Sequence, residues 1–236
     1  MSYPKKLSVV VPVFNEEQRI SGALKICQDF KKRFPSWEFI LVNDGSTDRT
    51  LELLKETKFK VVSYRKNQGK GYALKQGVAK ANQPLILICD VDFSTPLSEI
   101  TLLTPFVKKG AEMVIGSRRV QGAKVIKHQD RLREWLGAQF TNLSKLWLGL
   151  NVSDVTCGFK LFKKKTAKQL FKLSRIKRWG YDAEILFLAK KLDYQVVDVA
   201  VSWKNDERTK VSMGLDIIRS FIDLILIRWY NLTKQY

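Results

Sequence analysis

The chain has 236 residues, of which 45% are hydrophobic and 28% are charged, and its formal net charge is +19. This composition excludes a disordered chain and suits one large domain or a domain with an appendage. The charge is uneven, because residues 1–116 contain 18 Lys and Arg against 12 Asp and Glu, whereas residues 117–236 contain 24 against 11. The second half therefore favours an anionic partner, such as nucleic acid, a phosphorylated ligand or an acidic lipid surface.

The cysteines and the hydropathy pattern indicate a cytoplasmic protein. Cys27, Cys89 and Cys157 have no metal-binding spacing and leave one thiol unpaired in any disulfide scheme, so we expect reduced thiols. The first six residues are polar and lack a hydrophobic signal region. No run reaches the roughly 18 uncharged apolar residues of a spanning helix. Any membrane association is therefore expected to be peripheral.

Strand and helix patterns alternate along the first half of the chain. Expected strands cover residues 7–13, 37–42, 60–64, 85–89 and 113–116. Expected helices cover 19–34 and 49–58, a third follows a turn at 67–71 and runs to about 80, and another begins at 95–96. Such alternation at short intervals predicts a parallel, doubly wound α/β sheet. Each expected strand ends in a polar or glycine-rich loop, so these loops should gather along one edge of the sheet.

The second half of the chain has a different pattern. It predicts one or two helices within 121–150, extended backbone over 154–162, a helix over 181–191, a strand over 195–202, a charged loop over 203–210 and a last helix over 213–230. That last helix is apolar except for one polar stripe, which is typical of a helix lying at a membrane interface. A core-packing helix or the seam of a homodimer is the alternative.

Two carboxylates, Asp90 and Asp92, follow the apolar run Leu85 to Cys89. The run reads as a strand buried on both faces, and its carboxyl end is where open α/β sheets bind ligands. Residues i and i+2 of an extended chain point to the same side, so the pair could hold Mg²⁺ or Mn²⁺. An Asp-rich turn that caps the next helix is the alternative.

The ordered motifs of the chain resemble those of family 2 glycosyltransferases, which have the GT-A fold, a Rossmann-like α/β sheet. In the second half, the motifs are similar to those of dolichyl-phosphate β-glucosyltransferases, and dolichol-phosphate-mannose synthases match them less closely. The segments that carry the first resemblance are 10–17, 42–48, 90–92 and 116–118, and those that carry the second are 154–162 and 178–184.

The resemblance implies an inverting transfer of a hexose from a nucleotide sugar to a polyprenyl phosphate, dolichyl or undecaprenyl, with UDP-glucose as the favoured donor. Asp90 and Asp92 match the metal-binding Asp-x-Asp of the family. Synthases of the mannose type often have Gln where this chain has Ser94, which leaves the third protein ligand open. The residues that the resemblance places at the nucleotide sugar are Pro12, Phe14, Glu16, Asp44, Gly69, Lys70, Asp90, Val91, Asp92, Arg208 and Lys210; a simple turn at Gly69–Lys70 and a plain charged loop at 208–210 are the alternatives.

A phosphate acceptor is already anionic near neutral pH, so it needs cationic side chains that position it and no obligatory general base. Arg118, Arg131 and Arg133 are the candidates for this role, because a guanidinium can bind phosphate with two hydrogen bonds. A solvated face is the alternative for these arginines. Asp182 lies in a motif that borders the active site in the family and is a candidate catalytic residue, with capping or ion pairing as its alternative role.

We therefore expect a GT-A catalytic domain over residues 1–212, with nucleotide-sugar binding in 1–117 and acceptor binding in 118–212. Residues 213–236 are expected to form an amphipathic helix on the cytoplasmic face of a membrane, with a homodimer or a membrane-protein partner also open. A GDP-mannose-using enzyme and a same-fold transferase with a soluble sugar acceptor are the rival functions. A nucleic-acid-binding protein would share the charge, but no aromatic and basic RNA motif or zinc pattern is present.

Overall fold

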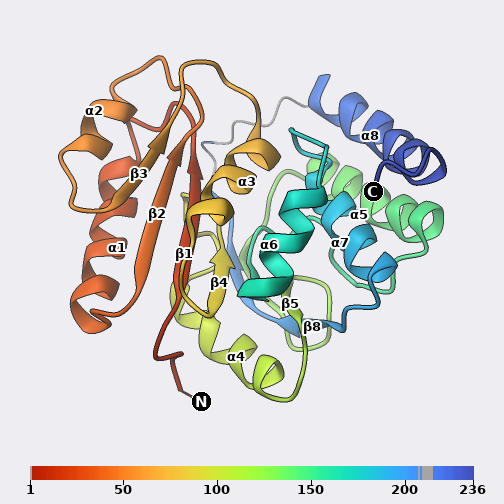
Figure 1. Ribbon diagram of the computed structural model, residues 1–236, viewed down its shortest axis with the longest axis horizontal. Helices are drawn as coiled ribbons and strands as arrows, with labels where there is room; N and C mark the ends of the chain where they lie inside the picture. Colours follow the sequence, from red (N-terminus) through yellow and green to blue (C-terminus); the bar gives the residue numbers. More distant parts are fainter. Residues whose placement is uncertain (1, 207, 209–214) are drawn as a thin grey trace.

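Seven strands form one sheet in the order β3-β2-β1-β4-β7-β5-β8 in the computed structural model, which describes residues 2–206, 208 and 215–236 (Figure 1). β7 runs antiparallel to both of its neighbours, and the other pairs are parallel. The α/β class and the mostly parallel sheet are thereby confirmed. The strands are β1 (Ser8–Val13), β2 (Glu38–Asn43), β3 (Lys60–Ser63), β4 (Leu85–Ile88), β5 (Met113–Ser117), β7 (Lys160–Lys163) and β8 (Val196–Ala200).

Helices cover both faces of this sheet, which is why its central strands are apolar without alternation. One face carries α1 (Ile20–Arg33), α2 (Thr50–Lys55) and α4 (Ile100–Lys108), and the other carries α3 (Lys70–Lys80), α6 (Lys164–Leu173) and α7 (Tyr181–Lys191) (Figure 1). Within β1, Val9 and Val11 belong to the first hydrophobic core, and Val10 between them belongs to the second. The sheet thus separates two cores and brings the carboxyl ends of β1, β2, β4 and β5 to one edge.

Two long helices lie beside the second core. α5 (Arg131–Leu148) and α8 (Leu215–Leu232) pack against each other, with the Phe140 and Phe221 rings edge to face at 5.7 Å between centroids. The Trp147 Nε1 group donates a hydrogen bond of 3.1 Å to the Leu224 carbonyl oxygen. Among the described residues, none of the helices has both the length and the apolar composition needed to cross a membrane.

Several local predictions differ from the structure. β7 enters the sheet from its carboxyl edge after α5, without the crossover that a parallel neighbour requires, so it is the antiparallel strand of this mostly parallel sheet. Helix α6 was not predicted. The short strands β6 (Lys124–Lys127) and β9 (Ser202–Lys204) pair in segments expected to be helix and loop, because neither has a hydrophobic run.

Two further details concern the first half of the chain. α4 begins after a 3-10 turn, η1 (Leu97–Glu99), and not directly at Thr95–Pro96, because Pro96 keeps an extended ψ of 143°. All three cysteines are free and buried, and burial raises the pKa of Cys27 to about 12. Such thiols are unreactive, as reduced core cysteines should be.

Candidate active site

A cleft of about 970 Å³ opens at the carboxyl edge of the sheet. Its walls come from the loops after β1, β2, β4 and β5, from the first turns of α3 and α7, and from α5 and α8. The structure therefore brings together nearly all of the candidate residues. Those that line the cleft are Pro12, Phe14, Glu16, Asp44, Gly69, Lys70, Asp90, Val91, Asp92, Arg118, Arg131, Arg133 and Asp182. Arg208 lies at an adjacent hollow, and Lys210 lies outside the described residues.

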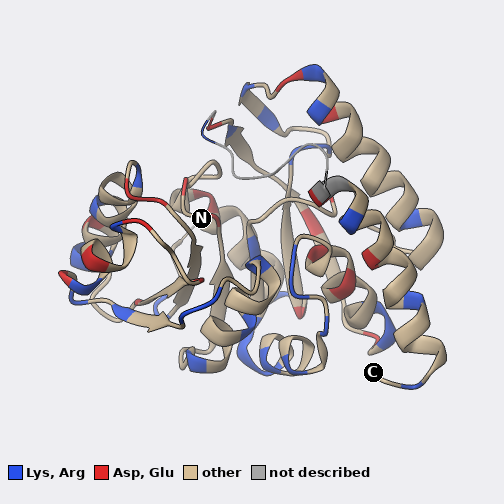
Figure 2. Cartoon of the chain, turned by 90° about the horizontal axis from the view of Figure 1, so that it is seen from above, with Lys and Arg blue, Asp and Glu red and all other residues tan. Residues whose placement is uncertain are grey.

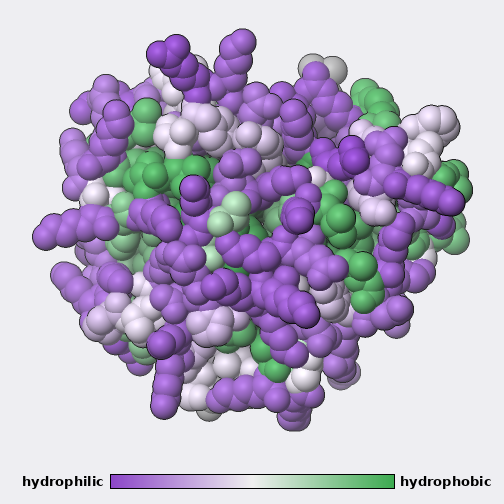
Figure 3. Space-filling model, in the orientation of Figure 1, coloured by the Kyte–Doolittle hydropathy of each residue, from purple (hydrophilic) through white to green (hydrophobic). Residues whose placement is uncertain are grey.

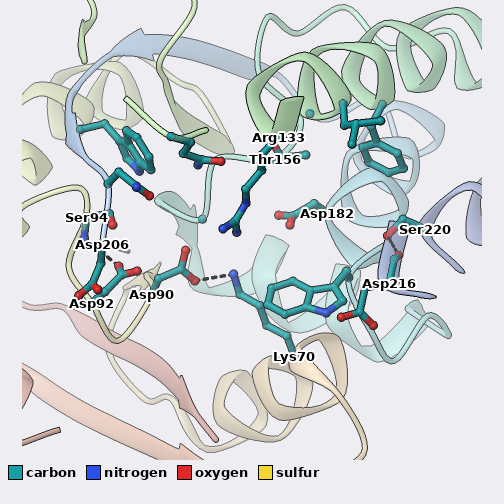
Figure 4. A pocket seen from close by; sticks show the side chains of 18 of the residues that line it. Lys70, Asp90, Asp92, Ser94, Arg133, Thr156, Asp182, Asp206, Asp216 and Ser220 are labelled. Atoms are coloured by element: carbon teal, nitrogen blue, oxygen red, sulfur yellow. Dashed lines mark hydrogen bonds and ion pairs between the residues drawn. The ribbon is translucent and has the colours of Figure 1, made fainter. Parts of the chain in front are cut away.

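Asp90 pairs with Lys70 across the floor of the cleft (Figure 4). Lys70 opens helix α3, and its side chain is only 14% exposed, with the Nζ atom 5.3 Å from the centre of the Trp179 ring. Burial by itself would raise the pKa of Asp90, but the charge and the hydrogen bond of Lys70 outweigh it and lower that pKa. Asp90 is therefore a carboxylate at neutral pH.

Asp92 lies beside Asp90 in a less compensated environment. Burial, followed by the charge of Asp90, raises the pKa of Asp92. The Ser94 N–H donates a hydrogen bond of 2.9 Å to Asp92 Oδ1, which fixes the turn after the second carboxylate. Arg19 Nη1 lies 4.0 Å from Asp92 Oδ2 and is also paired with Glu16. Asp92 thus lines the cleft with its Oδ2 atom 4.0 Å from Arg19.

Arg208 and Asp206 form an ion pair next to Asp92. Arg208 Nη2 lies 2.6 Å from Asp206 Oδ2, and this hydrogen bond is the main reason why the pKa of Asp206 falls to about 2. Arg19 Nη1 approaches the same carboxylate at 3.7 Å. Asp206 therefore links Arg208 to the arginine that faces Asp92.

The metal-ligand set of the cleft is limited to two carboxylates. Among the residues that the structure describes, no group of three or more His, Cys, Asp and Glu side chains could hold a metal ion. Asp90 and Asp92 have side chains that are 38% and 20% exposed and face one space. They could supply two hard oxygen ligands to Mg²⁺ or Mn²⁺, with the remaining ligands coming from phosphate oxygens and water.

Asp182 is held by a buried lysine. Lys160 is fully buried in β7, pairs with Asp182, and donates to the carbonyl oxygens of Val155 and Cys157. The same loop contains Gly158, where a Cβ would lie 2.8 Å from the Asp90 carboxyl carbon. Lys160 therefore orients Asp182 and also holds the backbone against which Asp90 packs.

Arg118 is clamped by a buried carboxylate. Its Nε and Nη2 atoms donate to Asp154 at 2.7 and 2.8 Å, and Nη2 also donates to Thr156 Oγ1 at 2.7 Å. Asp154 is fully buried, and although burial would raise its pKa, the Arg118 charge and hydrogen bonds hold that pKa far below the ordinary range. The guanidinium is thus fixed in one orientation at the wall of the cleft, 17% exposed.

Arg133 extends into the cleft between Asp90 and Asp182 (Figure 4). It stands in the first turn of α5, whose N-cap Asp130 accepts the Leu132 and Arg133 N–H groups. Burial, and then the charge of Arg118, lowers the pKa of Arg133, so two guanidiniums face one space. Cations held this close favour an anionic ligand between them. Arg131 lies at the rim of the same wall.

Asp44 and Glu16 have internal partners. Asp44 accepts hydrogen bonds of 2.8 Å from the Gln68 and Gly69 N–H groups and from the Asn67 side chain. It therefore anchors the loop that presents Lys70, and Gly69 adopts a φ of +105° in that loop. Glu16 is paired with Arg19, one turn along the chain.

Residues that the sequence did not single out also build the cleft. Arg19, Asp206 and Lys160 make the ion pairs described above, and Trp179 and Gly158 shape the space around Lys70 and Asp90. A lysine inside the apolar run Phe159–Phe162 was a detectable signal, since a buried lysine needs a buried partner. The roles of Arg19 and Asp206 depend on contacts between distant segments and gave no signal.

The model for the family "Glycosyl transferase family 2" matches residues 8–171. The dolichyl-phosphate beta-glucosyltransferase of Saccharomyces cerevisiae is 31% identical, over 98% of this chain and 76% of its own length. The human protein of the same name is 30% identical, over 98% and 78%. Glucosyl-3-phosphoglycerate synthase from Mycobacterium tuberculosis, solved with Mn²⁺, UDP and phosphoglyceric acid, has a TM-score of 0.67 at 20% identity, over 94% and 78%. This likeness shows a shared GT-A-like fold, and the chain belongs to glycosyltransferase family 2.

Proposed function

We propose that this protein transfers glucose from UDP-glucose to a polyprenyl phosphate, with inversion at the anomeric carbon. Two kinds of support agree. The relatives named above are dolichyl-phosphate beta-glucosyltransferases that match nearly the whole chain. The observation that carries the proposal is the cleft itself, in which the Asp90 and Asp92 pair faces Arg133 and the clamped Arg118.

The donor occupies the side formed by β1, β2 and α3. The nucleoside site lies at the carboxyl ends of the first two strands. The residues that contact the nucleoside or shape the space around it are Pro12, Phe14, Glu16 and Asp44. The diphosphate then lies over the first turn of α3, where Lys70 offers an ammonium and Gly69, whose N–H donates to Asp44, lets the backbone come close. Arg208, at the adjacent hollow, and Lys210 are the further candidates for contact with the diphosphate. The other donor-side residues are Asp90, Val91 and Asp92.

Asp90 and Asp92 would hold Mg²⁺ or Mn²⁺ together with diphosphate oxygens, and the two-carboxylate set on this strand end fits such a cation. When bound, the cation supplies Lewis-acid stabilisation of the charge that develops on the leaving diphosphate. The Mn²⁺ in the structure of the M. tuberculosis synthase supports this choice. Lys70 neutralises the same charge from the protein side.

The acceptor enters from the side of α5. Arg118, Arg131 and Arg133 bind its phosphate and aim one oxygen at the anomeric carbon. That oxygen forms the new bond as the bond to UDP breaks, and the electron pair leaves with the β-phosphate. The acceptor carries negative charge already, so no proton has to be removed. Asp182, oriented by Lys160, faces the sugar, where its carboxylate stabilises an oxocarbenium-like transition state.

These roles assign a function to each of three segments of the chain. Residues 1–117 bind the nucleotide sugar, 118–212 bind the acceptor and also supply Arg208 and Lys210 to the donor, and 213–236 lie on the cytoplasmic face of a membrane that contains the lipid acceptor. No general base is obligatory in this scheme, which separates it from a transferase that acts on a soluble sugar hydroxyl.

Transfer of label tests the proposal. The protein is incubated with labelled UDP-glucose, Mn²⁺ and a short polyprenyl phosphate, and label in the solvent-extractable lipid fraction is counted. We expect lipid-linked glucose, and we expect Asp92→Asn to lower turnover by about 10²-fold or more, since it removes a fixed charge from the transition state. Asp29→Asn, at an exposed position of α1, is the matched control.

Two parallel reactions distinguish the proposed function from a transferase with another donor or another acceptor. GDP-mannose replaces UDP-glucose in one, and a soluble sugar or phosphoglycerate replaces the lipid in the other. Faster transfer from GDP-mannose would contradict the donor assignment. Label on a soluble acceptor with none in the lipid fraction would contradict the acceptor assignment.

A further inference from the structure

The exposed large hydrophobic side chains of the described residues lie in three elements. Every large hydrophobic side chain that is exposed there lies in β6, α5 or α8, and Figure 3 shows such side chains along the right-hand edge, where Figure 1 draws α8 and α5. We name the surface of α5 and α8 the α5–α8 face. Its exposed residues are Leu132, Trp135, Leu143, Leu146, Trp147, Ile218, Ile222, Ile225, Trp229 and Leu232.

Core packing does not account for this face. In α8 the exposed residues recur at positions 218, 222, 225, 229 and 232, which is one stripe of the helix. A different stripe faces inward, where Leu224 and Ile227 are buried in the second core and Phe221 packs on Phe140. The helix thus has two apolar sides, and only one of them is covered by the described part of the chain.

The face continues into the cleft. Trp135 is 57% exposed on the face and also lines the cleft. Leu136, Phe140 and Phe221 also line the cleft, and Arg133 stands about two helical turns before Phe140 on α5. An amphiphile with an anionic head could therefore keep its chain on the face while its head reaches the arginines.

The tryptophans and the positive charge of the α5–α8 face favour an anionic bilayer as its partner. Three of the six tryptophans, Trp135, Trp147 and Trp229, lie on the face, and tryptophan is enriched where proteins meet the headgroup region of a bilayer. Exposed Arg131, Lys145 and Arg219 lie on the same two helices, and Figure 2 shows blue basic residues, with a few red acidic ones, along the mostly tan helices next to the C-terminus. A second copy of a chain with a net charge of +19 would be repelled, whereas an anionic bilayer would be attracted.

We propose that the α5–α8 face docks on an anionic lipid bilayer and that the polyprenyl chain of the acceptor passes over Trp135 into the cleft. This proposal rests on the lipid acceptor of the proposed function. It extends the membrane contact from the last helix to a pair of helices from different parts of the sequence. The cleft then opens toward the bilayer, so the acceptor phosphate need not leave the interface to reach Arg133.

Vesicle sedimentation tests the docking without nucleotide sugar or acceptor. The probe is vesicles of phosphatidylcholine with phosphatidylglycerol, and the variant is Leu146→Glu with Ile225→Glu, at side chains that are 83% and 61% exposed. We expect the variant to bind vesicles about tenfold or more weakly, because it replaces inserted apolar groups by like charge on an anionic surface. Gln28→Glu with Lys32→Gln in α1 changes the net charge equally at exposed positions and should sediment as the wild type does.

The outcomes distinguish docking from the proposed function. Equal sedimentation of the Leu146 and Ile225 variant and the wild type would overturn the docking proposal, as would a wild type that binds no vesicles. A wild-type dimer in solution that this variant dissociates would also overturn it and assign the face to a second copy. With a short acceptor in solution the variant should keep wild-type turnover, and with a long acceptor in vesicles it should lose turnover in parallel with binding. Failure of every transfer reaction, with vesicle binding intact, would count against the proposed function alone.

Discussion

The ammonium of Lys70 pairs with the Asp90 carboxylate at the strand end of the proposed divalent-cation site. Lys70 is largely buried, and its pKa is raised because the charges of Asp90 and Asp182 outweigh the effect of burial. A cation on Asp90 must therefore compete with an ammonium that stays protonated. The diphosphate of a donor would offer Lys70 another partner, so donor and metal should bind together.

Lys70→Met should accordingly strengthen the binding of Mn²⁺ in the absence of nucleotide. The substitution removes the competing charge and frees an Asp90 oxygen, and we expect about a tenfold lower Kd, since one charge pair in a half-buried site is worth about 1.4 kcal/mol or more. Titration calorimetry or the Mn²⁺ paramagnetic resonance signal measures this Kd directly. Turnover should fall, because Lys70 also contacts the diphosphate in the proposed function.

Lys80→Met, in the exposed last turn of the same helix, removes the same charge away from the cleft and should leave the Kd unchanged. Weaker Mn²⁺ binding by the Lys70 variant than by the wild type would show that the ammonium does not occupy the cation's place.

Gly158→Ala should lower turnover far more than it lowers stability. The added Cβ would overlap the Asp90 carboxylate, so this side chain must shift from the position in which it pairs with Lys70. We expect kcat to fall by about 10²-fold, as small displacements of catalytic groups do, with thermal unfolding within a few degrees of the wild type. Gly22→Ala is the control, because its Cβ would meet nothing within 4 Å and alanine favours a helix. Equal turnover in the two variants would argue against a role for the position of Asp90.

Asp154→Asn should cost about 3 kcal/mol of unfolding free energy at pH 7, since it leaves the partly buried Arg118 without its counter-charge. The pKa of Asp154 is depressed in the fold, so its contribution is fully present above the ordinary pKa of 3.8 and is lost as the pH falls toward the folded value. The difference between wild type and variant in urea unfolding should therefore shrink below pH 4. Thr156→Val, which removes one hydrogen bond to Arg118, should cost about 1 kcal/mol at pH 7. A difference that does not change with pH would rule out the charged pair as its source.

Asp223→Asn should change the pH dependence of stability in the opposite direction. Asp223 accepts the Gly180 N–H at the start of α7, and burial outweighs this bond and raises its pKa to about 6. Between pH 4 and 6 the folded state therefore binds more protons at this site than the unfolded state, and stability from this group decreases as the pH rises. The variant keeps an oxygen for Gly180 but has no proton to lose. Urea unfolding at pH 4.5 and pH 7 should show that the variant gains on the wild type at the higher pH; a constant difference would contradict the shifted pKa.

The strands and helices of the first half were predictable because each is a long, regular hydrophobic pattern with polar ends. The run Leu85 to Cys89 could only be a strand covered on both faces, and its carboxyl end placed Asp90 and Asp92 at the ligand-binding edge. The helix over 181–191 was predicted with the bounds that the structure has. Prediction was weakest for β6 and β9, whose pairing joins residues about 80 positions apart and leaves little local trace.

The order of residues was enough to predict the sheet, the carboxylate pair and the basic character of the second half, because these depend on local periodicity and composition. Which charged side chains pair with one another depends on the tertiary structure. Lys160 reaches Asp182 from β7, Asp154 clamps Arg118, and Lys70 covers Asp90, each across a contact between segments distant in the chain. Burial then determines the interaction energy of each ion pair, because water around a charge pair weakens the attraction. The same holds for the α5–α8 face, which exists because two helices from different parts of the chain pack side by side.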